Sequence, residues 1–212
     1  KDWEVSINGV LVVPNLLDLA PAAAYSLRSL DADADPNVVN VRRSSDNATS
    51  DFTASEVSDG TLTSWVGAGN DGHVTTWYDQ GGTNHAAQAT ASSQPKIVDG
   101  GTLVTEGGLA ALDFDGVDDY LAKIATFTIN GDHLMTAVHT PQVGYLFSIG
   151  YNDNQSVLFW SDSGNYSRYW LNSSIDQVNS GEAVAGQRLT LGEMSSGSQT
   201  LYIDGTQNST KS

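Results

Sequence analysis

The sequence predicts an all-β protein, an antiparallel β-sandwich with one short helix. Short runs rich in β-branched and aromatic residues recur along the chain, separated by clusters of Gly, Asn, Asp and Ser. No amphipathic helical pattern separates these runs, which favours strands joined by turns over alternating β-α-β units. The chain is long enough for one large domain of this kind to bury a full core.

The expected strands can be placed along the chain in order. They cover residues 37–43, 73–79, 111–116, 133–139, 145–150, 156–162, 167–172, 188–194 and 200–205. In 111–116, Leu112 and Phe114 alternate with aspartates, which predicts an inward apolar face. In 200–205, Leu201 and Ile203 are expected to point inward, and the Asp-Gly pair that follows is a turn signal.

The helix is expected at about residues 59–67. Asp59 could cap it, and Leu62, Trp65 and Val66 could form its buried stripe before the GAGN sequence ends it. Residues 19–30 fit either a helix or a first strand. Residues 1–13 form a separate strand or linker that Pro14 breaks from the main domain, residues 14–212.

Charge and composition restrict the partners. The chain has 25 acidic and 9 basic residues, a net charge of −16, which argues against nucleic acid and anionic membranes because phosphate groups are bound by clustered Lys and Arg. The longest apolar stretch, GVLVVPNLL (9–17), is interrupted by a proline and falls short of the roughly 20 residues of a membrane span. No cysteine is present, which excludes disulfides and thiol catalysis. No signal-peptide pattern is found. A neutral glycan suits the acidic surface of this chain as a partner.

The segments AYSLRSL (24–30), VRRSSDN (41–47), WYDQ (77–80) and FDGVDDYL (114–121), in this order, resemble the concanavalin A-like, LamG-type jelly rolls. Such modules occur in bacteriophage virion proteins and secreted bacterial proteins, and the same segments are more distantly similar to the catalytic domain of arabinofuranosidase B-type enzymes. The resemblance implies a jelly-roll sandwich located in a virion or outside the cell. Domains of this kind continue beyond the strand at 200–205, so the sandwich is expected to lack its last strands and to assemble with other subunits, as a homo-oligomer.

The resemblance to the arabinofuranosidases implies a nucleophilic Glu within residues 156–170, and cysteines near the site. That stretch contains no Glu and the chain has no Cys. Asp162 and Asp176 are the remaining carboxylates for a glycosidase. We therefore expect a non-enzyme, with a glycoside hydrolase as the alternative. The four histidines show neither metal-ligand spacing nor a nucleophile elbow nearby.

A structural calcium ion is the one cofactor that the sequence suggests. Asp79, Asn84 and Asp115, with Asp118 and Asp119, offer the oxygen ligands that calcium prefers. The favoured alternative is that Asp79 accepts backbone hydrogen bonds at the GGTN corner. Arg42 and Arg43 are expected to pair with Asp46 or Asp51.

A carbohydrate-binding set is expected between residues 152 and 172, because aromatic rings stack on sugars and polar side chains bind their hydroxyl groups. Its members are Asn152, Trp160, Asp162, Arg168, Trp170 and Asn172. In a strand, Arg168 and Trp170 share one face, although both tryptophans could instead fill the core. The resulting hypothesis is a non-catalytic glycan-binding module of a phage tail fibre, spike or capsid decoration, with a purely structural cementing domain as a further alternative.

Overall fold

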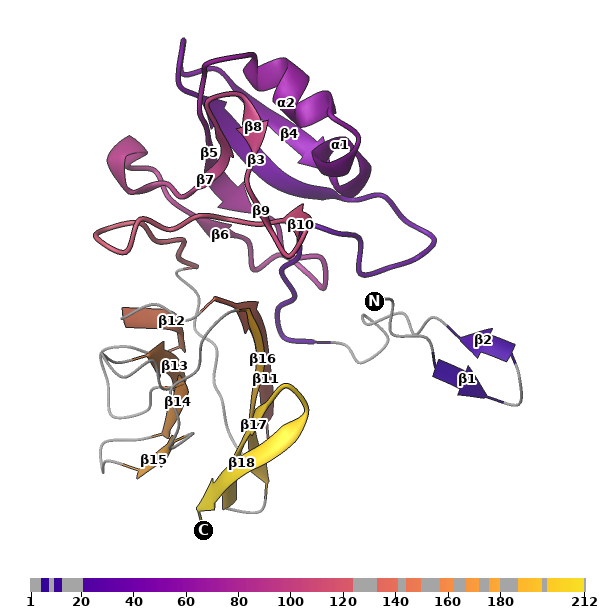
Figure 1. Ribbon diagram of the computed structural model, residues 1–212, viewed down its shortest axis with the longest axis vertical. Helices are drawn as coiled ribbons and strands as arrows, with labels where there is room; N and C mark the ends of the chain where they lie inside the picture. The colour runs from indigo at the N-terminus through magenta and orange to yellow at the C-terminus, as the bar shows by residue number, and fades with distance from the viewer. Residues whose placement is uncertain are drawn as a thin grey trace. The chain divides into compact units, whose positions relative to one another are not determined.

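The computed structural model describes residues 5–7, 10–12, 21–123, 133–140, 144–149, 157–161, 167–171, 176–179, 187–195 and 198–211. The chain divides into two compact units, unit 1 (Lys1–Ala125) and unit 2 (Thr126–Ser212). Every strand pair in the described part is antiparallel, and helices are few and short (Figure 1). The predicted all-β antiparallel fold is therefore confirmed. No described helix has both the length and the apolar character needed to cross a bilayer.

Unit 1 is built on a six-stranded sheet in the order β4-β3-β5-β7-β8, with β6 paired to β5. Its elements are β3 (Asn37–Arg43), β4 (Thr49–Thr53), α1 (Ala54–Ser58), α2 (Thr61–Val66), β5 (Gly72–Trp77), β6 (Ala86–Ala87), the 3-10 turn η2 (Ala91–Ser93), β7 (Lys96–Asp99) and β8 (Thr102–Leu103). Two small hairpins pair β1 (Val5–Ile7) with β2 (Val10–Val12) and β9 (Thr105–Glu106) with β10 (Leu109–Ala110).

The core of unit 1 lies between this sheet and the two helices. Leu62 and Val66 of α2 and Val57 of α1 are fully buried against the valines of β3, β5 and β7. Helix α1 starts with a capping box, in which Thr53 and Glu56 bond each other's backbone N–H groups. The helix was expected at 59–67 with Asp59 as its N-cap, but two helices form, and α2 is capped by Gly60 at φ 95°.

Two other expectations for unit 1 are wrong. Residues 111–116 form no strand; only Asp113 makes an isolated bridge, with Lys96, and Phe114 remains 36% exposed. Within the described part of 19–30 there is neither a helix nor a strand, only a bridge from Tyr25 to Asp79. Polar aspartates in 113–119 bond backbone N–H groups within their own loop, which replaces a strand ladder there.

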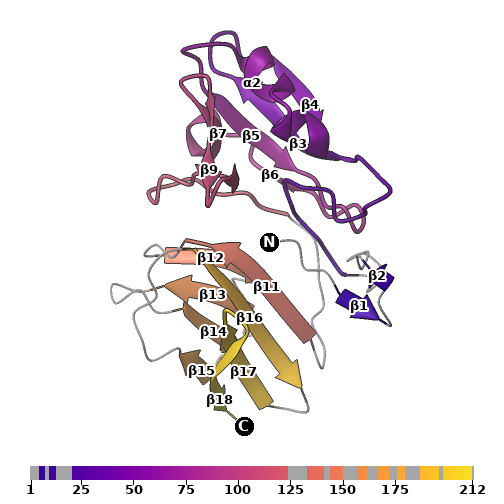
Figure 2. The same ribbon diagram turned by 45° about the vertical axis from the view of Figure 1, so that its right-hand side comes forward.

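Unit 2 contains two four-stranded sheets, whose strands Figure 2 labels. One has the order β11-β16-β17-β18, from β11 (His133–His139), β16 (Arg188–Ser195), β17 (Ser198–Ile203) and β18 (Thr206–Lys211). The other has the order β12-β13-β14-β15, from β12 (Gly144–Ile149), β13 (Val157–Ser161), β14 (Ser167–Leu171) and β15 (Asp176–Asn179). Leu201 is fully buried, and Asp204 and Gly205 turn with positive φ into β18, as the Asp-Gly signal predicts.

Candidate functional site: an acidic pocket in unit 1

A row of polar residues crosses three neighbouring strands of the unit 1 sheet. Arg42 of β3 pairs in register with His73 of β5, and His73 pairs with Lys96 of β7. Lys96 in turn bridges Asp113 through two backbone hydrogen bonds of 2.9 Å. Residues far apart in the sequence thus form one line across the sheet, because antiparallel pairing places opposed residues side by side.

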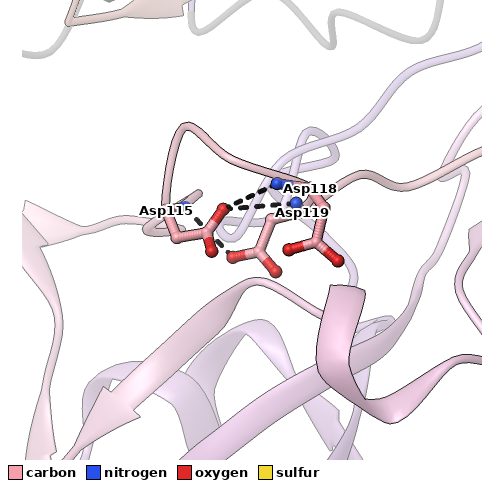
Figure 3. A group of neighbouring side chains, drawn as sticks. All are labelled: Asp115, Asp118 and Asp119. Atoms are coloured by element: carbon pink, nitrogen blue, oxygen red, sulfur yellow. Dashed lines mark hydrogen bonds between the residues drawn. The ribbon is translucent and has the colours of Figure 1, made fainter.

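This row lines a pocket of about 270 Å³. The pocket is lined by Arg42, His73, Ala91, Ser92, Gln94, Lys96, Asp113, Asp115 and Asp119. Its walls are charged and polar, and the acidic side is supplied by the loop that follows Asp113 (Figure 3). A pocket of this lining suits a ligand with many hydroxyl groups.

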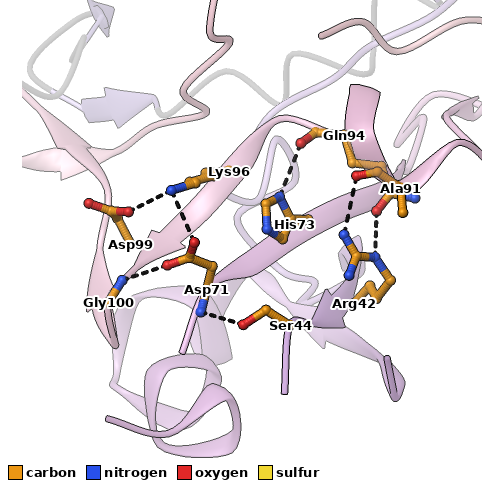
Figure 4. A network of polar contacts seen from close by, with 9 residues as sticks. All are labelled: Arg42, Ser44, Asp71, His73, Ala91, Gln94, Lys96, Asp99 and Gly100. Carbon is orange, nitrogen blue, oxygen red and sulfur yellow. Dashed lines mark hydrogen bonds and ion pairs between the residues drawn. The ribbon is translucent and has the colours of Figure 1, made fainter. Parts of the chain in front are cut away.

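The two bases beside His73 are held by protein acceptors (Figure 4). The Arg42 guanidinium donates to Gln94 Oε1 at 2.8 Å, Asn47 Oδ1 at 2.9 Å and the Ala91 carbonyl at 3.2 Å. Lys96 Nζ lies 3.0 Å from Asp71 Oδ2 and 2.7 Å from Asp99 Oδ1. Arg43, in contrast, pairs with Asp46 at 2.7 Å, as expected, whereas Arg42 pairs with neither Asp46 nor Asp51.

The acidic side of the pocket is a tight loop. Asp115 Oδ1 accepts the backbone N–H groups of Val117, Asp118 and Asp119, and Asp119 Oδ2 accepts the N–H of Asp115. Ligand oxygens of Asp115, Asp118 and Asp119 lie within 4.8 Å of one another (Figure 3). Asp118 Oδ2 accepts a bond from Ser93 Oγ at 2.8 Å.

Two of the three pocket carboxyls, those of Asp115 and Asp119, differ in proton affinity. The hydrogen bond from the Val117 N–H, with those from the next two residues, lowers the pKa of Asp115. Partial burial raises the pKa of Asp119, and the neighbouring carboxylates Asp115 and Asp118 add to this rise. Neighbouring carboxyls with pKa values moved in opposite directions are suited to separate acid and base roles.

Asp79 lies at a different place, the corner after β5. Its carboxylate is buried and accepts the N–H groups of Ala24 at 2.8 Å, Gly81 at 2.9 Å and Asn84 at 3.0 Å. Tyr25 donates its hydroxyl to the Asn84 carbonyl, and the Asn84 amide nitrogen donates to the Ala22 carbonyl. This is the geometry of a turn-stabilising aspartate.

The bonds at Asp79 and at Asp115 bear on the expected calcium ion. A calcium ion needs carboxylate lone pairs, and several of these are directed at backbone N–H groups. Calcium at Asp79, Asn84 and Asp115 therefore stays a prediction, to be tested by the effect of a chelator on thermal stability.

The side chains of the expected carbohydrate-binding set lie outside the described part of the structure. Asn152, Asp162 and Asn172 fall outside the described residues. Trp160 of β13 pairs in register with Arg168 of β14, and Trp170 pairs with Leu158. For these residues the structure describes the backbone pairing alone. Asp176 begins β15. The carbohydrate role of these residues stays a prediction.

No local sequence pattern predicts the pocket in unit 1 as a whole. The sequence suggests Asp115, Asp118 and Asp119 as metal ligands, but no motif marks His73 or Gln94 as functional residues. The register of β3, β5 and β7 assembles these residues, and no local sequence signal reports that register.

The fold has solved counterparts. No known sequence family and no curated protein matches the chain. A mutant of a GH54 α-L-arabinofuranosidase soaked with 4-nitrophenyl α-L-arabinofuranoside superposes with a TM-score of 0.65 at 13% identity. A GH54 α-L-arabinofuranosidase soaked with a cyclic sulfate inhibitor gives 0.62, and an arabinofuranosidase complexed with arabinofuranosyl-α-1,2-xylobiose gives 0.61, both at 12% identity. Each match covers 90% of this chain and 50% of the other, so the chain spans about half the length of these structures.

These counterparts correct one expectation and support another. The expectation of a non-enzyme is contradicted, because the three matched structures of this fold are arabinofuranosidases. The distant similarity to arabinofuranosidases is confirmed at the level of the fold. The LamG-type and bacteriophage assignments, including virion subunits as partners, stay predictions. The chain has the fold of the GH54 α-L-arabinofuranosidases over half of their length.

Proposed function

We propose that this chain is a glycoside hydrolase that removes furanosyl groups from a glycan, and that the acidic pocket of unit 1 is its reaction site. The single observation that supports this most is a charged pocket holding two carboxyls with opposite pKa shifts, Asp115 and Asp119. The shared fold with arabinofuranosidases is the second support.

The carboxyls must come from a place other than the one that the resemblance implies. Within residues 156–170, where the arabinofuranosidase resemblance implies a nucleophilic Glu, the chain has none. In the loop of Asp115 and Asp119, two pocket-lining carboxyls have oxygens within 4.8 Å of one another. Retaining glycosidases hold their two carboxyls about 5–5.5 Å apart and inverting ones about 6.5–9.5 Å apart, so this upper limit favours the retaining class.

The roles follow from the hydrogen bonds. Asp119, whose raised pKa favours the protonated form, donates a proton to the glycosidic oxygen as the C–O bond breaks. Asp115 stays ionised, and its Oδ2, which has no protein partner among the described residues, attacks the anomeric carbon. Water then cleaves the glycosyl ester while Asp119 takes its proton, which restores both groups.

The substrate class is proposed from the ligands of the counterpart structures. Those enzymes were solved with 4-nitrophenyl α-L-arabinofuranoside and arabinofuranosyl-α-1,2-xylobiose. A volume of about 270 Å³ is at the small end of ligand pockets. It suits a single furanosyl group better than a long stretch of polysaccharide.

The test is hydrolysis of these two compounds by the purified chain. Wild type should release 4-nitrophenol and arabinose, and Asp119→Asn should lower kcat by about 10²- to 10⁴-fold. Asp99→Asn, an exposed carboxyl outside the pocket lining, is the matched control and should leave the rate unchanged. A folded chain inactive on a panel of pentofuranosides would contradict the proposal, as would an Asp119→Asn variant of wild-type rate.

The pH profile gives an independent check. Activity should rise with pH as Asp115 ionises, which its lowered pKa places at acidic pH. It should fall again as Asp119 loses its proton, at a pH above that of an ordinary Asp because its pKa is raised. A rate that keeps rising through neutral pH would exclude Asp119 as the acid.

A further inference from the structure

His73 occupies the centre of the polar row in the pocket. Arg42 lies beside it on β3 and Lys96 on β7, and Asp119 lines the same pocket. The side chain is half-buried and lines the pocket. Its two ring nitrogens have different surroundings.

The hydrogen bond at Nδ1 determines the tautomer. Nδ1 lies 3.2 Å from the backbone carbonyl oxygen of Gln94 (Figure 4). A carbonyl oxygen only accepts hydrogen bonds, so Nδ1 must carry the proton, and Nε2 of the neutral ring is left with a lone pair.

Gln94 is itself rigidly held, so the ring orientation is preset. Gln94 is 4% exposed, donates from Nε2 to the Gln88 carbonyl at 2.8 Å and accepts from Arg42 Nε at 2.8 Å. Both ends of its amide are therefore bonded. The carbonyl that orients His73 belongs to a residue with little freedom to move.

Nε2 of His73 has no hydrogen-bond partner among the described residues. The fully buried side-chain atoms without a partner in that part of the chain are Trp77 Nε1 and Arg188 Nε, so Nε2 of His73 is unpaired but not fully buried. A side chain that lines a pocket and leaves one nitrogen accessible and unpaired presents that nitrogen to a ligand. The ligand atom must be a donor, since Nε2 in this tautomer is an acceptor.

We infer that His73 is a specificity-determining residue whose Nε2 accepts a hydrogen bond from one hydroxyl group of the bound sugar. The inference rests on the proposed function, because it assumes that the pocket takes a sugar. Loss of one hydroxyl from the substrate would leave Nε2 unpaired in the complex, which costs binding energy in the transition state as well as in the ground state.

Two substitutions separate the nitrogens. In His73→Asn the amide nitrogen takes the place of Nδ1, so the bond to the Gln94 carbonyl is kept and Nε2 is lost. In His73→Gln the amide reaches the position of Nε2 and the Nδ1 donor is lost. His73→Asn should lower kcat/KM on 4-nitrophenyl α-L-arabinofuranoside about 10-fold, and His73→Gln should recover part of this loss.

Deoxy substrates give the readout that a structural role would not change. With one of the 2-, 3- and 5-deoxy analogues, wild type and His73→Asn should have equal kcat/KM, while the other two analogues should keep the about 10-fold difference. An equal loss on the parent and all three analogues would overturn the inference.

An experiment without turnover separates this inference from the proposed function. Nitrogen NMR of wild type in buffer of about pH 8.5, where an ordinary imidazole is neutral, should show Nδ1 protonated and Nε2 bare. Addition of methyl α-L-arabinofuranoside should shift Nε2. A protonated Nε2, or no shift with saturating sugar, would overturn the inference even in an active enzyme. An inactive chain that still shows both signals would contradict only the proposed hydrolysis.

Discussion

Strand β3 of unit 1 and strand β11 of unit 2 have the same length, seven residues, but bury their side chains differently. In β11, exposed Leu134 and Val138 alternate with buried Met135, and the strand pairs with β16 residue for residue. In β3, the successive residues Val38 and Val39 are both fully buried. The pairing of β3 with β4 shifts at this point, leaving Val38 as an extra residue.

Strand β7 repeats the behaviour of β3. Ile97 and Val98 are both fully buried, and the register with β5 passes from Val98 to Lys96, leaving Ile97 extra. In a β-bulge, two residues of one strand lie opposite a single residue of the partner strand, and the extra residue's side chain is redirected. Unit 1 thereby buries successive apolar residues, and the shift at Ile97 places Lys96 opposite His73, which pairs with Arg42. The regular strand β11 and the bulged strands β3 and β7 therefore differ both in the burial of successive residues and, at β7, in the alignment of pocket residues.

The largest expected effect is at the Asp79 corner of unit 1. Asp79→Ala removes the acceptor of three backbone N–H groups, two of them in the following turn. We expect the free energy of unfolding to fall by about 4 kcal/mol, since unpaired buried donors are costly. Asp31→Ala removes a single exposed bond, to the Asp33 N–H, and is the control with little expected effect in urea unfolding. Equal losses would mean that the corner does not hold unit 1 together.

The next effect concerns unit 2 and its half-buried His139. Burial lowers the pKa of His139 to about 4, and its Nε2 lies 3.0 Å from Oγ1 of fully buried Thr190. Above about pH 7.5 the ring is neutral in both states and contributes nothing to the pH dependence. As the pH falls towards 4 the unfolded chain gains the proton first, so the folded state loses up to about 3 kcal/mol.

The measurement is chemical unfolding of wild type and His139→Gln from pH 7.5 to 4. The difference between the two stabilities should change over this window, most steeply between about pH 6 and 4.5. A constant difference would show that His139 titrates alike in both states. Because the comparison is between variants, the protonation of carboxylates common to both cancels.

A smaller effect tests the bulge itself. Val38→Thr and Val39→Thr each place a hydroxyl in the core at nearly constant volume, and each should cost about 2 kcal/mol. In β11 the two corresponding substitutions should differ in their cost. Met135→Thr should be destabilising, whereas Leu134→Thr, at a site 60% exposed, should cost less than about 0.5 kcal/mol. If Val38→Thr were neutral in thermal unfolding, β3 would alternate like β11 and the bulge would be absent.

The smallest expected effect is at the edge of the pocket. Lys96→Met removes the ion pairs with Asp71 and Asp99, whose partly exposed geometry limits the loss to about 1 kcal/mol or less. The loss should shrink in high salt because the charges are screened. Lys123→Met is the matched control, since the Lys123 ammonium donates to the Thr83 carbonyl at 3.4 Å and forms no ion pair with the described residues. A loss that salt does not change would mean that Lys96 acts through packing.

Local patterns predicted elements where a strand is regular and ends in a turn signal. Residues 37–43 and 133–139 were placed with their observed bounds, and the turn at Asp204-Gly205 was recognised from its residue types. The expected strand at 111–116 is wrong because alternation there reflects aspartates that bond their own loop. The helix was placed near α2, but its cap was missed, since Asp59 accepts the Thr61 N–H at 2.8 Å yet lies outside the helix.

The sequence by itself determined the all-β class, the absence of thiol chemistry and the acidic surface, because composition and periodicity are local properties that survive any arrangement of the strands. Only the tertiary structure decided that Arg42, His73 and Lys96 share one row and meet Asp119 in one pocket. The physical reason is that strand register and bulges depend on pairing between distant segments, where one residue of shift moves a side chain to the other face.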